Sequence, residues 1–235
     1  MHPKASVVLT RLNTARNTND EYWWKNIIQF NFNNRRNGLH DTQYCNINYI
    51  DENNIISPLH IRCFNKRHVS FLKSIYNSGF SINIFKCNKD NEEESIYYQL
   101  ASVISEIFTE EASKLQFCTK KVKCPEGKIP VANKKIIPLV NSNITKIKIR
   151  FNEYFSMYKD GEKIDINEEN VNTFMPSNTL IDVLVDMGSI CFSSQGISIV
   201  PIANVVKVVK CLPFQFHKYT IDDLVSDDDE DQLDK

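Results

Sequence analysis

The chain has 235 residues, enough for one large domain or two small ones with a proper hydrophobic core. Hydrophobic residues make up 42% and charged residues 24%, and the mean hydropathy of −0.35 excludes a disordered or membrane-embedded chain. The formal net charge of −1 hides an asymmetry. Residues 219–235 carry eight acidic side chains and one lysine, whereas the rest of the chain carries 27 basic and 21 acidic side chains. We therefore expect a basic body with an acidic tail.

Several function classes lack their usual sequence signals. The motifs GxGxxG and GxxxxGK[ST] of glycine-loop nucleotide folds do not occur. The first thirty residues lack the apolar run of a secretory signal, and no apolar stretch approaches the roughly 18 residues of a membrane span. The seven cysteines are odd in number and form no CxxC pair. These features predict reduced thiols in an intracellular compartment.

The first half of the chain is predicted to contain a β-meander. We expect a flexible arm over residues 1–20 and then strands over 22–32, 43–50 and 55–64, with turns at 33–41 and 51–54. The spacing of Val69, Leu72, Ile75 and Tyr76 predicts a short helix over 69–76, which Asn77-Ser78-Gly79 ends. A further strand is expected over 80–87.

The clearest helix is predicted over 92–117, because its apolar residues follow the 3.6-residue period. A lysine-rich segment with three prolines, 119–138, is the expected connection between two halves. Beyond it the pattern is again β, with strands over 144–155, 180–185, 189–192 and 197–209. We therefore divide the chain into an arm (1–20), a first half (21–118), the connection (119–138), a second half packed on the first (139–212) and an acidic tail (213–235).

Enzyme chemistry finds little support. A metal site needs clustered histidine, cysteine and carboxylate ligands, and the nearest approach is His60, Cys63 and His68. On a strand His60 and Cys63 point to opposite faces, so this trio is a poor chelate. Serine-nucleophile and kinase signatures are absent. We therefore expect no catalytic residue, no metal and no cofactor.

Binding of single-stranded nucleic acid requires cations for phosphates and aromatic faces for bases, and the chain interleaves both. A meander of this content is one wall of an oligonucleotide-binding (OB) barrel. The fold class we predict is α+β and β-rich, an OB-like barrel core with an inserted long helix and additional C-terminal strands. The candidate binding residues are Trp23, Trp24, Lys25, Phe30, Phe32, Arg35, Arg36, Tyr44, Tyr49, Arg62, Phe64, Lys66, Arg67, Lys120, Lys121, Lys123, Lys134, Lys135, Lys146, Lys148 and Arg150.

Each of these signals has a structural alternative. Trp23 and Trp24 are adjacent, so on a strand one indole points inward and one outward, and the sequence does not say which. For any single aromatic residue, core packing is the commoner role. The alternation of Lys146, Lys148 and Arg150 with apolar residues also fits the solvated face of a half-buried sheet.

The tail has two readings as well. After residue 212 an aromatic segment leads into a polyanion, and the residues expected to gate the groove or dock partners are Phe214, Phe216, Asp222, Asp223, Asp227, Asp228, Asp229, Glu230 and Asp231. A tethered polyanion competes with nucleic acid for a basic groove at high effective concentration. The alternative is a solubilising terminus.

The closing segments carry a family resemblance. The pattern begins with a hydrophobic strand, residues 181–192. A short polar turn with glycine and a second hydrophobic strand follow within 193–199, and a basic–apolar segment closes the pattern at 205–209. An acidic terminus begins at Thr220. This pattern resembles the single-stranded DNA-binding proteins of large DNA viruses, of the poxvirus and asfarvirus type. The resemblance covers about the last 90 residues. It implies a non-catalytic protein that coats DNA strands in replication and recombination, in the host nucleus or at a cytoplasmic replication site.

The leading hypothesis is sequence-nonspecific binding of single-stranded DNA, with RNA left open because stacking and phosphate contacts barely distinguish the two. Replication proteins are the expected partners of the tail, and self-association on DNA is a further expectation; no membrane is expected. The rival hypothesis is a non-catalytic scaffold or interaction subunit of a replication or transcription complex. Titration with a bare oligonucleotide separates the two, because a scaffold would not bind it.

Overall fold

The computed structural model describes residues 2–18, 20–37, 42–73, 80–85, 92–115, 117–118, 129–130, 135–141, 144–167, 169–176, 179–193 and 195–211. In residues 65–73, 80–85, 92–95, 117–118, 129–130, 141 and 144–145 it describes the backbone alone.

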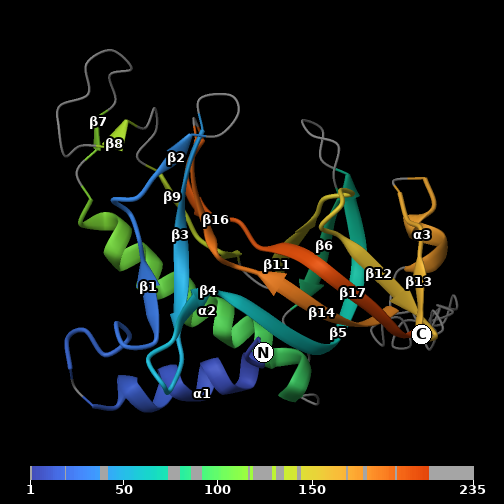
Figure 1. Ribbon diagram of the computed structural model, residues 1–235, viewed down its shortest axis with the longest axis horizontal. Coiled ribbons are helices and arrows are strands. Elements are labelled where there is room, and N and C mark those ends of the chain that lie inside the picture. Colours follow the sequence, from blue (N-terminus) through green and yellow to red (C-terminus); the bar gives the residue numbers. More distant parts are fainter. Residues whose placement is uncertain are drawn as a thin grey trace, which may run out of the picture.

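The protein is a strand-rich α+β structure in which two sheets stand side by side (Figure 1). The helices of the described residues are α1 (Ala5–Arg16), α2 (Glu92–Ser113) and α3 (Val171–Phe174). The first sheet contains β1 (Ile28–Phe30), β2 (Arg36–Asn37), β3 (Gln43–Ile50), β4 (Ile56–Pro58), β9 (Ile136–Ile137), β15 (Ser189–Ser193) and β16 (Gly196–Ile199). The second contains β5 (His60–Lys73), β6 (Phe80–Phe85), β10 (Val140–Asn141), β11 (Ile144–Ile149), β12 (Ser156–Lys159), β13 (Glu162–Ile164), β14 (Thr179–Asp186) and β17 (Ile202–Cys211). A separate pair joins β7 (Phe117–Cys118) to β8 (Ile129–Pro130).

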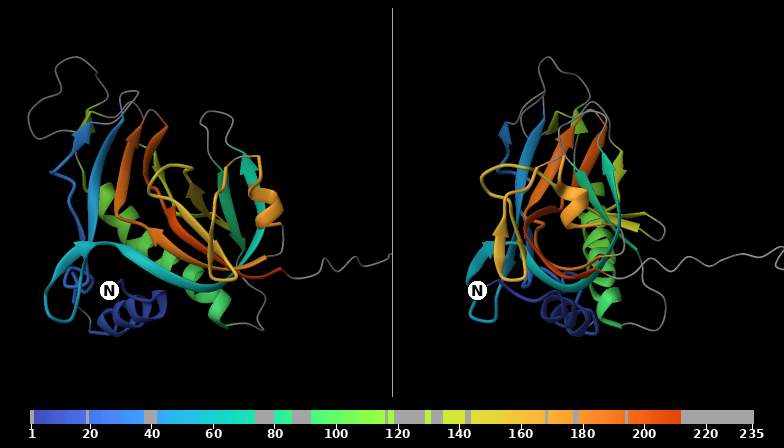
Figure 2. Two further views of the ribbon diagram at one scale, coloured as in Figure 1. Left: turned by 45° about the vertical axis from the view of Figure 1, so that its right-hand side comes forward. Right: turned by 90° about the vertical axis from the view of Figure 1, so that its right-hand side faces the viewer.

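Five strands of the second sheet curl into a ring. β5 pairs antiparallel with β6 and β14, β6 pairs antiparallel with β11, and β14 pairs antiparallel with β17. A short parallel pairing of β11 with β17, at Lys148 opposite Ile202 and Ile149 opposite Ala203, closes the circuit. A five-stranded barrel of mixed strand directions is compatible with an OB-like fold. Figure 2 shows the curled strands of this ring from two further sides.

The two sheets are joined where strands pass from one to the other. Leu59 links β4 to β5, Met187 and Gly188 link β14 to β15, and the pair Val200 and Pro201 links β16 to β17. Backbone hydrogen bonds tie the first two links together: the N–H of Leu59 donates to Ile47 O (3.1 Å), and the N–H of Met187 donates to Leu59 O (2.9 Å). Both halves of the chain therefore contribute strands to both sheets.

Helix α2 contacts β9 of the first sheet and β5, β10 and β11 of the second, and it carries much of the core. Leu100, Ile104 and Phe108 are fully buried on it, as the apolar period of the sequence predicts. The prediction of a helix from residue 92 is confirmed.

Helix α1 replaces the flexible arm that we predicted over residues 1–20. Val8 and Leu12 on it are fully buried, and it packs against α2, where Arg16 forms an ion pair with Glu106. Burial of this apolar stripe outweighs the modest helix propensity of the asparagine and threonine residues around it.

The other predicted elements divide into confirmed and incorrect ones. The strands expected at 43–50, 80–87, 180–185 and 189–192 exist with small boundary shifts. The helix expected over 69–76 was wrong, because residues up to Lys73 continue strand β5 and pair with β6. The strand expected over 22–32 shrinks to β1, and residues 21–27 form turns. The strands expected over 55–64 and 197–209 are each divided between the two sheets, the first into β4 and β5 and the second into β16 and β17. The meander that we expected as one wall of the OB barrel therefore lies mostly in the first sheet, as β1, β3 and β4, and only β5 enters the ring.

Candidate nucleic-acid interface

A groove of about 300 Å³ lies at the junction of the two sheets. Arg36, Asn37 and Tyr44 line it from β2 and β3, and Ser189 lines it from β15. Arg150, directly after β11, lines it from the barrel side. Val200 and Ile202 complete the lining where β16 passes to β17. Two cations and an aromatic ring from separate strands therefore meet in one groove.

Strand alternation explains why these side chains face outward. On β3 the side chains of Cys45, Ile47 and Tyr49 are buried, so Tyr44 and Asn46 lie on the opposite face. On β11 the side chains of Ile147 and Ile149 are fully buried. Lys146, Lys148 and Arg150 are exposed, which confirms the predicted division of this strand into a basic and an apolar face.

Polar contacts fix the groove wall on the β3 side. The Arg36 guanidinium donates to Asn46 Oδ1 (2.8 Å), and Arg36 stands opposite Tyr44 in the strand register. Tyr44 in turn stands opposite Cys191, and its hydroxyl hydrogen-bonds the thiol. Burial raises the pKa of Cys191, against the hydrogen bond from Tyr44 and the positive charges of Lys148 and Arg150. Lys148 therefore acts on the same face as Arg150.

One carboxylate lies at the edge of this basic surface. Asp186 Oδ1 accepts from the N–H of Gly188 (2.7 Å) and lies 3.5 Å from His60 Nε2. Burial alone would raise the pKa of Asp186, but hydrogen bonds from His60 and Gly188 and the charges of His60 and Arg150 outweigh it and lower the pKa. Asp186 is therefore an anion held beside Arg150.

Three of the nominated aromatic residues belong to the core. Trp24 is 4% exposed, Tyr49 is 5% exposed and Phe32 is 9% exposed. We nominated them as base-stacking candidates, and the structure corrects this, because a ring without accessible faces offers no stacking platform. The inner indole is Trp24, which packs edge-on to Phe30 at a centroid distance of 5.5 Å.

Phe30 and Trp23 are partly buried. Phe30 stacks on Phe32 at 5.7 Å and packs against Phe108 of α2 at 6.2 Å. Trp23 packs against the core and lies under the Arg16 guanidinium, which is 5.7 Å from the indole centroid. Neither residue lines the groove. Tryptophan fluorescence therefore reports on the core and α1 rather than on the groove.

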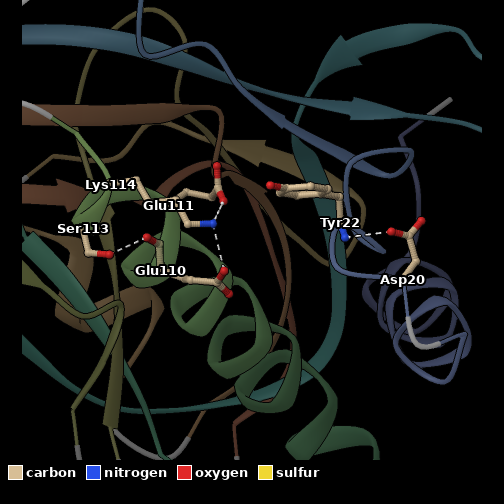
Figure 3. A network of polar contacts seen from close by, with 6 residues as sticks. All are labelled: Asp20, Tyr22, Glu110, Glu111, Ser113 and Lys114. Atoms are coloured by element: carbon tan, nitrogen blue, oxygen red, sulfur yellow. Dashed lines mark hydrogen bonds and ion pairs between the residues drawn. The ribbon is translucent and has the colours of Figure 1, made fainter.

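Lys25 belongs to a cluster with Tyr22 and Lys114 at the end of α2. Figure 3 shows Tyr22, Lys114 and the polar contacts around them. Lys25 Nζ lies 3.5 Å from the Tyr22 ring centroid, and Lys114 Nζ lies 5.7 Å from the same ring. Hydrogen bonds to Glu111 (2.8 Å) and Glu110 (2.9 Å) raise the pKa of Lys114. This cluster fastens the turn at residues 20–25 to α2.

Other nominated residues lie apart from the groove. Arg35 donates to the carbonyl of Phe32 (3.1 Å), and the carbonyl of Lys135 accepts from the N–H of Ile197 (2.9 Å). Arg62 and Phe64 lie on β5, beside the N-terminal segment. The side chains of Lys66, Arg67, Lys120, Lys121, Lys123 and Lys134, and the tail residues Phe214, Phe216, Asp222, Asp223, Asp227, Asp228, Asp229, Glu230 and Asp231, lie outside the described residues.

The weak metal candidate separates as its strand position predicts. Cys63 is buried at 1% exposure, whereas His60 lies on the outer face and contacts Asp186. The side chain of His68 lies outside the described residues. In the part of the chain that the structure describes, no three of the side chains His, Cys, Asp and Glu form a group that would hold a metal ion.

Sequence reasoning missed several residues at or beside the groove. Ser189 and Cys191 alternate with buried Ile190 and Phe192, a period-2 signal that marks an outward polar face. No local signal predicted that Asn37 would face Arg150.

No protein-family model matches the chain, and no curated protein is similar to it. Among solved structures, the chain is similar to the single-stranded DNA-binding protein from bacteriophage Enc34. The TM-score is 0.40 and the identity 12%, over 75% of this chain and 93% of that chain. A TM-score of this size does not establish a common fold. The specific resemblance to poxvirus and asfarvirus proteins stays a prediction.

Across the described ranges, no helix combines the length and the apolar character needed to cross a membrane.

Proposed function

We propose that the groove binds single-stranded nucleic acid without sequence specificity. In this proposal Arg36 and Arg150 neutralise phosphates from opposite walls, and Tyr44 offers its ring to a base. The observation that carries the proposal is the meeting of these three side chains in one groove. Cations that track the backbone and rings that stack on bases are the two requirements of such sites.

The groove favours an unpaired strand over a duplex. In a duplex each base is stacked between its neighbours, so an aromatic ring in the wall of a groove finds no free base face. An unpaired base can be splayed out and stacked on Tyr44. The groove of about 300 Å³ also admits single nucleotide units better than a whole double helix.

The order of the barrel strands adds support by analogy of fold. We infer that β5, β6, β11, β14 and β17 are the five strands of an OB-like barrel, with α2 inserted between the second and third strands. OB-folds bind oligonucleotides on strands 2 and 3 and through the loops between strands 1 and 2 and between strands 4 and 5. Lys146 and Lys148 lie on the third strand here, and Ser189 lies in the fourth connection. Fold analogy by itself does not assign a function.

The biological setting is part of the proposal. A non-catalytic, intracellular protein that coats exposed strands during replication or recombination fits a basic groove with an acidic tail. We propose that the tail competes for the groove and recruits replication proteins. Viral origin rests on the family resemblance of the closing segments.

The test is a titration of fluorescein-labelled oligothymidylate with the full chain, followed by anisotropy, with duplex DNA and RNA of equal length as competitors. We expect saturable binding of the single strand that weakens as salt rises, because bound cations displace counterions. The double variant Arg36→Ala/Arg150→Ala should lose most of this binding. A wild-type protein that binds none of the three nucleic acids would overturn the proposal in favour of a scaffold role.

A further inference from the structure

A second basic and aromatic surface lies beside β5, and we call Lys4, Arg62 and Phe64 the N-terminal patch. The N–H of Arg62 donates to the carbonyl of Pro3 (2.9 Å), and Lys4 forms a parallel bridge with Arg62. The residues before α1 thus add a short extended segment to the edge of β5.

The side chains of the N-terminal patch bring a charge next to a ring. Lys4 Nζ lies 5.7 Å from the Phe64 ring centroid. Phe64 is 38% exposed although it is a large apolar residue on a barrel strand. An ammonium and a guanidinium beside an accessible ring form the local arrangement that one nucleotide needs, with phosphate on the cation and base on the ring.

The N-terminal patch is continuous with the groove across the outside of the barrel. Lys148 stands opposite Ile202, Ile202 opposite Asp186, and Asp186 opposite His60, so these four residues form one row across β11, β17, β14 and β5. His2 extends the row, with its ring 5.1 Å from the His60 ring. Three strand spacings of about 4.8 Å each place His60 about 15 Å from Lys148.

The sign of the charge changes in the middle of this row, where the acidic Asp186 stands between basic residues. At one end of the row Ile202 lines the groove and Lys148 stands opposite it on β11. At the other end Arg62 follows His60 by two residues on the same face of β5. Asp186 is the acidic group between them, and it is engaged by His60 and Gly188. A nucleic-acid strand that leaves the groove therefore meets cations again beyond one carboxylate, whose Oδ1 already accepts from the N–H of Gly188.

We propose that the N-terminal patch is a second binding site for the same single strand of nucleic acid, which crosses the barrel from the groove. The inference rests on the proposed function of the groove. Lys4 and Arg62 contact phosphates and Phe64 stacks on a base. The patch lies on β5, the first β-strand of the barrel. It therefore increases the number of nucleotides that one protein molecule covers and does not change the affinity of the groove itself.

The experiment compares short and long labelled single strands of DNA, of about 4 and 16 nucleotides, the range of site sizes for one OB-fold. Wild type is measured beside Lys4→Ala/Arg62→Ala/Phe64→Ala and beside the groove variant Arg36→Ala/Arg150→Ala. A charge-matched control, Lys163→Ala/Lys210→Ala, removes two exposed lysines, of which Lys210 lies roughly 25 Å along β17 from the groove.

We expect the patch variant to bind the long strand about tenfold or more weakly than wild type does and to bind the short strand like wild type. The groove variant should weaken both. Because the triple variant removes the half-buried Arg62, Lys4→Glu provides a second test that leaves the fold alone, since the Lys4 side chain is exposed. This single variant should weaken binding of the long strand and leave binding of the short strand unchanged.

Two other outcomes separate the ideas. If wild type binds neither strand, the proposed function of the groove is wrong. If wild type binds both strands and the patch variant and Lys4→Glu match it on both, the groove stands and the second site is wrong. Equal weakening of the short and long strands by Lys4→Glu would also overturn the second site, because the patch would then act on the groove.

Discussion

Arg36 and Arg150 line the same groove from different sheets, Arg36 on β2 and Arg150 at the end of β11. Arg36 is held by Asn46, while Arg150 lies near Asp186 and Cys191. The pair is the most direct structural support for a polyanion site, because two guanidinium groups would otherwise gain nothing from facing one another.

Removing these cations should lower the affinity for single-stranded DNA. It should also make that affinity less dependent on salt concentration. Arg36→Ala and Arg150→Ala should each reduce the slope of log affinity against log salt by about 0.7, the value for one phosphate contact with a single strand. Anisotropy titrations at four salt concentrations measure the slope. The control Lys163→Ala/Lys210→Ala should keep the wild-type slope; a control that loses as much as the groove variants would mean that the charge effect is general rather than local.

The Tyr44 ring should matter more than its hydroxyl. Tyr44→Ala removes a stacking platform worth about 1–3 kcal/mol per base, whereas Tyr44→Phe keeps the ring and loses the hydrogen bond to Cys191. The expected order of affinity is wild type close to Tyr44→Phe, and both well above Tyr44→Ala. Tyr22→Ala is the matched control, since Tyr22 lies in the lysine cluster at the end of α2. A Phe variant as weak as the Ala variant would refute stacking.

Thiol reactivity should map the groove. Burial raises the pKa of Cys45 to about 12 and also raises that of Cys191, so both thiols hold little thiolate at pH 8. Among the described cysteines, exposed Cys211 should therefore be alkylated first by iodoacetamide, and buried Cys45 and Cys63 last. Peptide mass spectrometry measures the rates. Saturating oligonucleotide should slow labelling of Cys191, opposite Tyr44, and leave Cys211 unchanged; equal rates with and without oligonucleotide would place the strand elsewhere.

Asp186 should stabilise the fold at neutral pH. Its pKa in the folded protein lies below its ordinary value of 3.8, so its contribution is present above that value and is lost as the pH falls through the folded pKa. Asp186→Ala should cost about 2 kcal/mol in urea unfolding at pH 7, because it removes the acceptor for His60 and Gly188. The difference between the variant and wild type should shrink on going to pH 3. A difference that is equal at pH 7 and pH 3 would show that the charge of Asp186 contributes nothing.

Deleting residues 222–235 should tighten binding of single-stranded DNA, with the largest effect at low salt. The deletion removes eight acidic side chains and Lys235, a net charge of −7, that compete for the basic surface. The matched control replaces the seven aspartates from Asp222 to Asp234 with Asn and Glu230 with Gln, which removes the same eight acidic charges and keeps the length. Truncated and neutralised proteins should behave alike; unchanged or weaker binding by both would remove the gating role of the tail.

The local hydrophobic pattern predicted the helices and strands whose apolar residues follow a clear period or whose pairing partners are near in the sequence. The period of Leu100, Ile104 and Ile107 indicates α2, and the alternation around Ile147 and Ile149 indicates β11. The failures have a common cause. The spacing of Val69 and Leu72 fits a helix, yet pairing of β5 with β6 and β14 makes a long strand, because distant partners outweigh local spacing.

The sequence predicted the residue types of the candidate site better than it predicted which of those residues meet in one groove. The basic face of β11 follows from alternation alone, but the meeting of Arg36, Tyr44 and Arg150 depends on the closure of the barrel by β11 and β17. No local signal carries that pairing. Trp24 was nominated because aromatic and basic residues are interleaved around it in the sequence. The turn over residues 21–27 instead directs its indole into the core beside Phe30.

The three links at Leu59, Gly188 and Pro201 bear on the energetics of association. Since the strands of one groove wall continue directly into those of the other, a hinge motion would have to break the hydrogen bonds that join Leu59 to Ile47 and Met187. The groove is thus preorganised, and the loss of conformational entropy on binding falls on the nucleic acid rather than on the protein. Such a receptor needs no closing step, so its association rate should follow diffusion and charge attraction alone.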